Sequence, residues 1–221
     1  MAALRQGVIA LAILLAMCAA AGAQSCPPSE RAPEVRIAAE LPPPSYRNSL
    51  TRPRIGALSG DGHMSSDRTH AGLTQTRTDF SVRPTLSFQR LSGGRVCASL
   101  KSLEASWRMV TFQVDVAAEY RPGTCQHTEV LRHENQHVAI AQRAFTLAER
   151  SLRADLQELA RRTQPFVIRG TPAQAADEMA RRFMAAGRPA LERYQRDTER
   201  ENRAIDTPEG YRAVTARCQN W

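Results

Sequence analysis

A long amphipathic helix that carries a metal-binding motif is the feature that most limits how this chain can fold. Apolar residues recur every seventh position over residues 131–159, with alanines on the same side: Leu131, Val138, Phe145, Leu152 and Leu159. This spacing places them on one helix face, which must be buried against the rest of the domain. Thr124 follows Gly123 and suits an N-cap, and Pro165 ends the pattern. The sequence therefore predicts a helix over residues 125–163.

The motif His133-Glu134-Asn135-Gln136-His137 lies near the start of this helix. Residues four apart on a helix are neighbours, so both imidazoles can face one metal ion. Glu134 would lie beside that ion, where a carboxylate can take a proton from a metal-bound water and pass it to a leaving amine. We predict a zinc site with His133 and His137 as ligands and Glu134 as the base. The alternative is a pair of ordinary polar residues on a surface helix.

A second long helix is expected after residue 170. Thr171 and Gln174 have the spacing of a capping box, with Pro172 at the first helical position. Apolar residues then follow on one side as far as Ile205, and the Gly187 to Pro189 segment is expected to kink or break the helix. A short last helix is predicted to begin at Thr207-Pro208-Glu209 and to run toward Cys218.

A catalytic zinc site usually has three protein ligands, so the motif needs one more. If the two long helices are antiparallel about a turn near residues 167 and 168, His137 faces position 198 and His133 faces position 202. In order of preference, the candidate ligands are Asp197, Glu201 and Glu199. The alternative for each is a surface carboxylate paired with a neighbouring arginine.

Hydrolysis of an amide also needs a donor that stabilises the negative charge developing on the carbonyl oxygen. Tyr194 is the first candidate for this catalytic role, and Tyr211 and His127 are the others. Tyr120 fits better in the core.

Residues 80–120 show the alternation of β-strands. Strands are predicted over residues 80–88, 96–100 and 110–120, and Ser92-Gly93-Gly94 between the first two indicates a hairpin. The result would be a small antiparallel sheet that leads directly into the motif helix, in an α+β fold. An edge strand of such a sheet can pair with an extended peptide.

The first 77 residues are interpreted as lying outside the folded domain. Residues 1–23 resemble a secretory signal, with Arg5, an apolar run and the Ala21-Gly22-Ala23 cleavage site. Lipidation at Cys18 or Cys26 is the alternative. Residues 24–77, rich in Pro, Gly and Ser, are expected to form a largely disordered linker, with His63 and His70 in surface roles. The domain would span residues 78–221.

Removing the signal would leave four cysteines, Cys26, Cys97, Cys125 and Cys218, in a compartment that permits disulfides. We favour Cys97 with Cys125, which would join sheet to helix, and hence Cys26 with Cys218. A metal site made of cysteines is disfavoured because no CxxC spacing occurs.

The formal net charge of +8 comes from arginine, since Lys101 is the single lysine. Solvated helix faces explain Arg161-Arg162 and Arg181-Arg182, and contact with anionic envelope components is the alternative. The chain has few aromatic residues and no recognisable nucleic-acid-binding module, so nucleic acid is not an expected partner.

The order of sheet, Gly123-Thr124-Cys125, HExxH motif and Tyr194 to Thr198 segment resembles the domain-of-unknown-function 922 family of secreted bacterial proteins, catalogued as zinc-dependent proteases. The resemblance covers roughly residues 78–207. It implies a zincin-like fold, zinc at His133 and His137, and Glu134 as base. The hypothesis is a periplasmic or secreted zinc metallopeptidase with a peptide or protein substrate. The alternative is a non-catalytic envelope scaffold with a structural metal or none.

Overall fold

A hairpin of two very long strands forms the main part of the sheet. The computed structural model describes residues 25–59 and 70–221, and in it β3 (Gly72–Arg90) pairs antiparallel with β4 (Val96–Val116). The short 3-10 turn η1 (Ser92–Gly94) joins them, with positive φ at Gly93 and Gly94. The hairpin predicted at this position is confirmed, whereas the strands predicted over residues 96–100 and 110–120 belong to one continuous strand.

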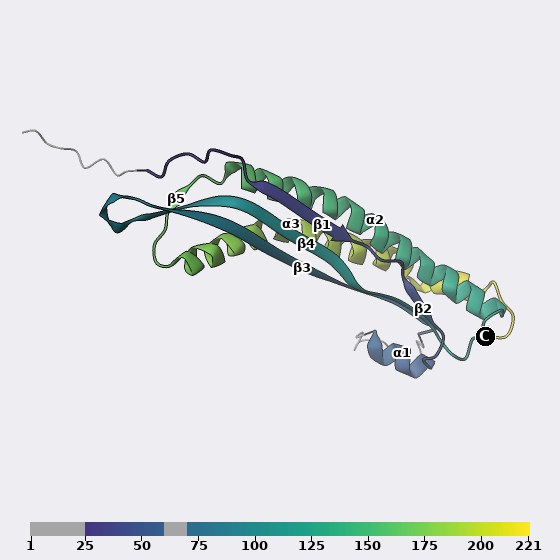
Figure 1. Ribbon diagram of the computed structural model, residues 1–221. Helices are drawn as coiled ribbons and strands as arrows, with labels where there is room; N and C mark the ends of the chain where they lie inside the picture. The colour runs from purple at the N-terminus through teal and green to yellow at the C-terminus, as the bar shows by residue number, and fades with distance from the viewer. Residues whose placement is uncertain (1–24, 60–69) are drawn as a thin grey trace, which may run out of the picture.

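The sheet is mixed, so the predicted small antiparallel sheet is wrong. β1 (Glu34–Glu40) and β2 (Ser45–Arg47) pair with β4 in parallel, and β5 (Phe166–Val167) pairs with it antiparallel. The five strands and the helices make a mixed α/β fold (Figure 1).

The interpretation of residues 24–77 as a disordered linker is also wrong for its described residues, 25–59 and 70–77, which contain β1, β2, α1 (Arg52–Leu58) and the start of β3. In β1, apolar Val35, Ile37 and Ala39 pack against the core, and the prolines on either side of the strand hid this short alternation. The proposed signal over residues 1–23 and His63 lie outside the described residues.

Two irregularities in the β3–β4 pairing determine which face of β4 is buried. The register shifts between Arg77 and Thr78, where Val110 is passed over, and between Thr85 and Leu86, where Lys101 is passed over. An extra residue in one strand reverses the alternation of its side chains. Residues 103, 105, 107 and 109 are therefore buried between the two bulges, whereas residues 112, 114 and 116 are buried beyond them.

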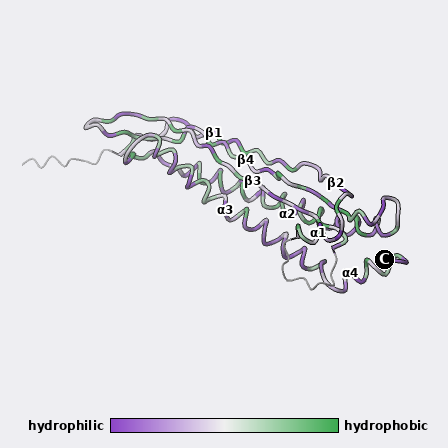
Figure 2. Tube along the Cα trace, turned by 90° about the horizontal axis from the view of Figure 1, so that it is seen from below, coloured by the Kyte–Doolittle hydropathy of each residue, from purple (hydrophilic) through white to green (hydrophobic). Residues whose placement is uncertain are grey.

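The helices follow the predictions closely. α2 (Cys125–Arg162) begins at Thr124, whose side chain accepts a hydrogen bond from the backbone N–H of His127. α3 (Pro172–Ile205) begins with the expected capping box, and α4 (Pro208–Thr215) with the Thr207 cap. α3 continues through Pro189, so the predicted break does not occur. α2 and α3 form a layer alongside the sheet (Figures 1 and 2).

The core lies between the sheet and these two helices. Trp107 of β4 is fully buried and stacks on Phe145 of α2, with ring centroids 4.0 Å apart. Tyr194 of α3 meets the Trp107 ring edge-on at 5.7 Å. Gly187 lets α3 approach β3 closely, because a Cβ there would lie 2.7 Å from the Phe80 ring.

The disulfides pair differently from the prediction. Cys26 bonds to Cys97 and Cys125 bonds to Cys218. The predicted pair of Cys97 with Cys125 is impossible in this fold, because β4 separates these residues by about 60 Å at about 3.3 Å per residue. The disulfides are consistent with an oxidising compartment. Among residues 25–59 and 70–221, no helix is both long and apolar enough to span a bilayer.

Candidate metal centre

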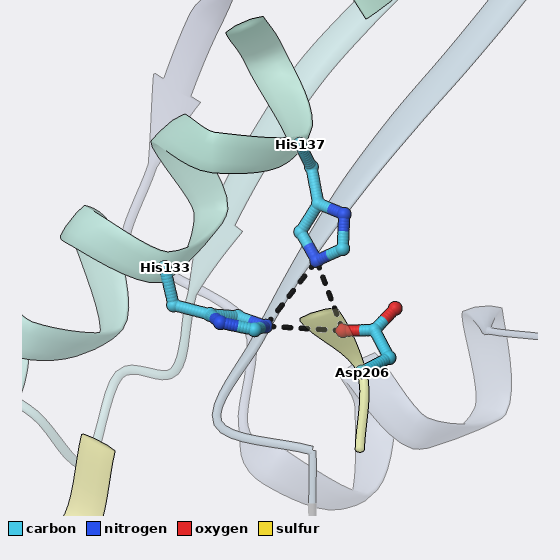
Figure 3. Close-up of side chains that lie close together, drawn as sticks. All are labelled: His133, His137 and Asp206. Atoms are coloured by element: carbon cyan, nitrogen blue, oxygen red, sulfur yellow. Dashed lines mark hydrogen bonds and ion pairs between the residues drawn. The ribbon is translucent and has the colours of Figure 1, made fainter. Parts of the chain in front are cut away.

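Three side chains direct one ligand atom each toward a common point. The Nε2 atoms of His133 and His137 are 3.2 Å apart, and the Oδ1 atom of Asp206 lies 3.1 Å from each of them (Figure 3). The two histidines come from adjacent turns near the start of α2, and Asp206 follows the last residue of α3. The structure therefore confirms that the imidazoles of the motif converge.

The dimensions of this triangle suit a small metal ion. Ligands about 2.0–2.1 Å from a tetrahedral zinc ion lie about 3.3–3.4 Å from one another. The observed edges are close to one face of such a tetrahedron, and the fourth position would remain for water or substrate. The residues fit a divalent cation held by two imidazoles and one carboxylate, which is a common donor set for a catalytic metal.

The charges and hydrogen bonds around the triangle also favour a cation. Asn202 of α3 accepts a hydrogen bond from Nδ1 of His137 at 2.9 Å, which leaves the Nε2 lone pair of the neutral ring for a ligand. Burial lowers the pKa of His137, but hydrogen bonds to Asp206 and Asn202 outweigh it and raise this pKa to about 8. Burial raises the pKa of Asp206, but hydrogen bonds to the two histidines outweigh it and bring the pKa well below its ordinary value. A positive charge is therefore stabilised at this point.

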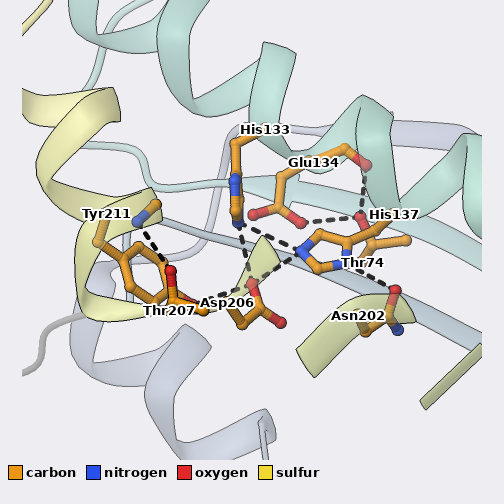
Figure 4. A network of polar contacts seen from close by, with 9 residues as sticks. Thr74, His133, Glu134, His137, Asn202, Asp206, Thr207 and Tyr211 are labelled. Carbon is orange, nitrogen blue, oxygen red and sulfur yellow. Dashed lines mark hydrogen bonds and ion pairs between the residues drawn. The ribbon is translucent and has the colours of Figure 1, made fainter. Parts of the chain in front are cut away.

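Glu134 is buried beside the triangle and held in a fixed position. The hydroxyl of Thr74 in β3 donates to its Oε2 at 2.8 Å (Figure 4). Gly72 makes room for it, because a Cβ at position 72 would lie 2.6 Å from Oε1 of Glu134. Burial raises the pKa of the Glu134 carboxyl, and the neighbouring His137, Thr74 and His133 oppose that rise. Such a carboxyl is suited to accepting and releasing a proton.

Asp206 takes the place predicted for Asp197, Glu201 or Glu199. These three carboxylates instead pair with arginines: Asp197 with Arg200, Glu201 with Arg143 and Glu199 with Arg203. The contacts of His137 with Asn202 and of His133 with Asp206 place the facing residues four positions, about one helical turn, beyond the predicted register. The connection between the helices is not a tight symmetrical turn, since it includes β5.

Tyr194, predicted as the catalytic donor, is part of the core instead. Its side chain is buried against Trp107 and Phe145, and burial raises its pKa while the nearby Thr76 and Thr198 hydroxyls oppose that rise. Tyr211 of α4 lies at the site, with its hydroxyl 3.2 Å from Oδ1 of Asp206 and its ring 5.5 Å from that of His133. His127 lies in the first turn of α2, outside the residues that line the cavity described below.

A cavity of about 650 Å³ opens beside the metal triangle. Residues 70–74, at the start of β3 and just before it, form one wall, and α4 with Trp221 forms another. Arg52 of α1, Tyr120 and Val130 also line the cavity.

The C-terminal segment is anchored next to the site by several contacts with α2. The Cys125–Cys218 disulfide joins it to the first residue of α2. Arg217 pairs with the buried Glu129 at 3.0 Å, and Gln126 donates to the carbonyl groups of Gln219 and Asn220. These contacts hold α4, and therefore Tyr211, near the metal triangle.

Comparisons with protein-family models, curated proteins and solved structures give no match for this chain. The resemblance to the domain-of-unknown-function 922 family thus rests on its motif residues alone.

Proposed function

We propose that this protein is a zinc-dependent metallopeptidase. The observation that carries the proposal is the convergence of His133, His137 and Asp206 within 3.2 Å of one another, with the buried carboxyl of Glu134 beside them. The donor set and the tetrahedral spacing favour zinc over the hard cations, which prefer oxygen ligands.

The residues of the site divide the chemistry between them. Zinc, when bound, supplies a Lewis acid that lowers the pKa of water to about 7. Glu134 accepts a proton from the attacking water and later gives it to the amine that leaves. The Thr74 hydroxyl keeps Oε2 of Glu134 in place for both steps. Asn202 orients the His137 ring through its Nδ1 hydrogen bond.

A peptide substrate fits the cavity as an extended strand. Within the described part of the chain, β3 pairs with β4 alone, so its other edge offers backbone N–H and C=O groups. Residues 72–74 of this strand line the cavity and lie against Glu134. Pairing along this edge would bring a peptide carbonyl to the metal triangle.

Tyr211 is the proposed donor to the carbonyl oxygen during attack. Its hydroxyl lies next to Asp206 and lines the cavity, whereas Tyr194 is enclosed in the core. A phenol at this position can shift its hydrogen bond from Asp206 to the developing negative charge.

The proposed location is the periplasm or the extracellular space. The two disulfides and the predicted signal segment support an oxidising compartment. The cationic surface would allow contact with anionic envelope components.

The central test combines metal analysis with the Glu134→Gln variant. The purified chain is expected to contain about one equivalent of zinc, and the variant to retain that zinc while losing hydrolysis of a mixture of unfolded proteins, by a factor of at least about 100. Glu149→Gln, on the same helix but paired with Arg153, is the matched control and should keep full activity. Hydrolysis by Glu134→Gln at the wild-type rate would refute the mechanism. Zinc without hydrolysis by the wild type would favour the scaffold alternative.

A further inference from the structure

The cavity beside the metal triangle is lined by Arg52, which forms no ion pair with an acidic residue of the described ranges 25–59 and 70–221. Arg52 is the first residue of α1, and its guanidinium carbon lies 5.8 Å from the centroid of the Tyr120 ring. Its Nε atom is buried and has no hydrogen-bond partner among the residues that the structure describes. The nearby Glu119 carboxylate accepts hydrogen bonds from the Arg52 backbone N–H, at 3.0 and 3.2 Å.

Among the described arginines, Arg52 is the one with a buried side-chain nitrogen that has no hydrogen-bond partner. Many of them form ion pairs, and Arg212, which lines the same cavity, pairs with Glu209. Leaving a buried N–H group without an acceptor costs free energy, so such a group is commonly satisfied by water or by a ligand. A guanidinium group matches a carboxylate in both charge and shape, because it can donate two parallel hydrogen bonds.

The surroundings of Arg52 suit a side chain or a chain end of a peptide. Tyr120 lies under the guanidinium group, where it can restrict its orientation. Ser59 and His70 add polar groups to the wall, with Oγ of Ser59 3.2 Å from Nε2 of His70. Leu73 and Val130 supply apolar surface in the same cavity.

We propose that Arg52 binds a carboxylate of the substrate and thereby selects peptides that carry a negative charge on one side of the cleaved bond. The inference rests on the proposed peptidase function and adds the substrate class to it. The carboxylate has two possible sources, an acidic side chain or the C-terminus of the peptide. Both present the same group to Arg52, and the experiment separates them.

Binding can be measured without catalysis through Trp221. This residue lines the cavity and is 39% exposed, whereas Trp107, the other tryptophan, is completely buried. The probes are Ala–Ser hexapeptides with blocked ends that carry one Glu at each position in turn, each with a Gln partner. A further pair has no Glu and ends in a free carboxylate or an amide. Each is titrated against the zinc-loaded Glu134→Gln variant by intrinsic fluorescence.

At one position, the Glu peptide is expected to bind about tenfold more tightly than its Gln partner, as a charge-assisted hydrogen bond would produce. If the C-terminus is the natural ligand, the free acid shows this advantage over the amide instead. Adding Arg52→Gln should abolish the preference, Arg52→Lys should restore part of it, and Arg54→Gln, two residues along α1, should leave it unchanged.

Two results would overturn the inference: equal binding of all charged and neutral partners, or a preference that survives Arg52→Gln in a variant with the wild-type circular dichroism spectrum. The measurement is independent of hydrolysis by the wild type. A charge preference in a protein that hydrolyses nothing would refute the peptidase proposal and leave the anion site standing. Hydrolysis without a charge preference would refute the anion site and leave the peptidase proposal standing.

Discussion

The individual residues of the motif could be identified from sequence because their spacing alone determines their geometry. A helix places His133 and His137 on the same side whatever surrounds them, and both are buried next to Asp206. Asp206 could not be identified in the same way, since it lies beyond the last residue of α3 and its position depends on how two helices pack. The one local signal was the Asp206-Thr207-Pro208 sequence, which marks the end of one helix and the start of the next.

Replacing the third ligand tests this assignment directly. Asp206→Ala should weaken zinc binding more than any change to the groups that orient the histidines, because it removes a ligand atom and the negative charge that offsets the metal. Asp197→Asn, in the residue that was predicted from sequence, should leave zinc binding unchanged, since Asp197 pairs with Arg200. Competition with a fluorescent zinc chelator measures both affinities. Equal losses in the two variants would contradict the assignment.

Asn202 provides a prediction about ring orientation. Asn202→Leu removes the acceptor that holds Nδ1 of His137 at 2.9 Å. Loss of such an orienting partner is expected to weaken metal binding by about 10–100-fold. Thermal unfolding of the metal-free variant serves as the control, because a general loss of folding would lower the midpoint temperature without metal as well. An unchanged zinc affinity would show that the ring needs no support from α3.

At the scale of whole elements, the helices were predictable and the sheet was not. The seven-residue spacing in α2, its Thr124 cap and the capping box of α3 are local signals, and they gave both bounds of α2 and the start of α3 to within about two residues. In β4 the two bulges reverse the alternation at Lys101 and Val110, so one strand resembled two. The parallel pairing of β1 joins residues about 70 positions apart, and such contacts leave no periodic signal in the sequence.

Substitutions at two glycines distinguish the effect of overpacking at the site from the effect of overpacking in the core. Gly72→Ala would place a Cβ against Glu134 and Val130, whereas Gly187→Ala would place one against Phe80 and Leu152. Each change should lower the free energy of unfolding by about 1–3 kcal/mol through overpacking. Only Gly72→Ala should also lower kcat, because it displaces Glu134 while leaving the metal ligands in place. Urea unfolding and peptide hydrolysis distinguish them, and a similar fall in kcat for Gly187→Ala would contradict this account.

At the scale of the molecule, the sequence indicated an oxidising compartment but not the connectivity of the cysteines. Pairing Cys97 with Cys125 seemed to join sheet to helix, yet the length of β4 separates them by nearly the whole sheet. The actual pairs anchor the two chain ends separately: Cys26 near the hairpin end, and Cys218 at the end that holds the metal triangle. Each disulfide therefore anchors a different end of the chain.

Removing the disulfides one at a time should reveal these two roles. The Cys26→Ala/Cys97→Ala and Cys125→Ala/Cys218→Ala variants should each lose about 2–4 kcal/mol of stability, because both bonds close long loops of the unfolded chain. Cys97 lies about 56 Å along β4 from Val114, the residue paired with Thr74, at about 3.3 Å per residue, so loss of the Cys26–Cys97 bond should leave zinc affinity unchanged.

Loss of the Cys125–Cys218 bond instead frees the segment that carries Tyr211 and follows Asp206 directly. Zinc affinity in that variant should fall by about tenfold, as when a group that orients a ligand is removed. Each double variant replaces one disulfide by two alanines, and the expected losses of stability are similar. Zinc titrations of both variants, under conditions where each is fully folded, therefore test only the effect of where the lost disulfide lies. Equal zinc affinities in the two variants would mean that Arg217, Glu129 and Gln126 are sufficient to hold the C-terminal segment against α2 without the covalent bond.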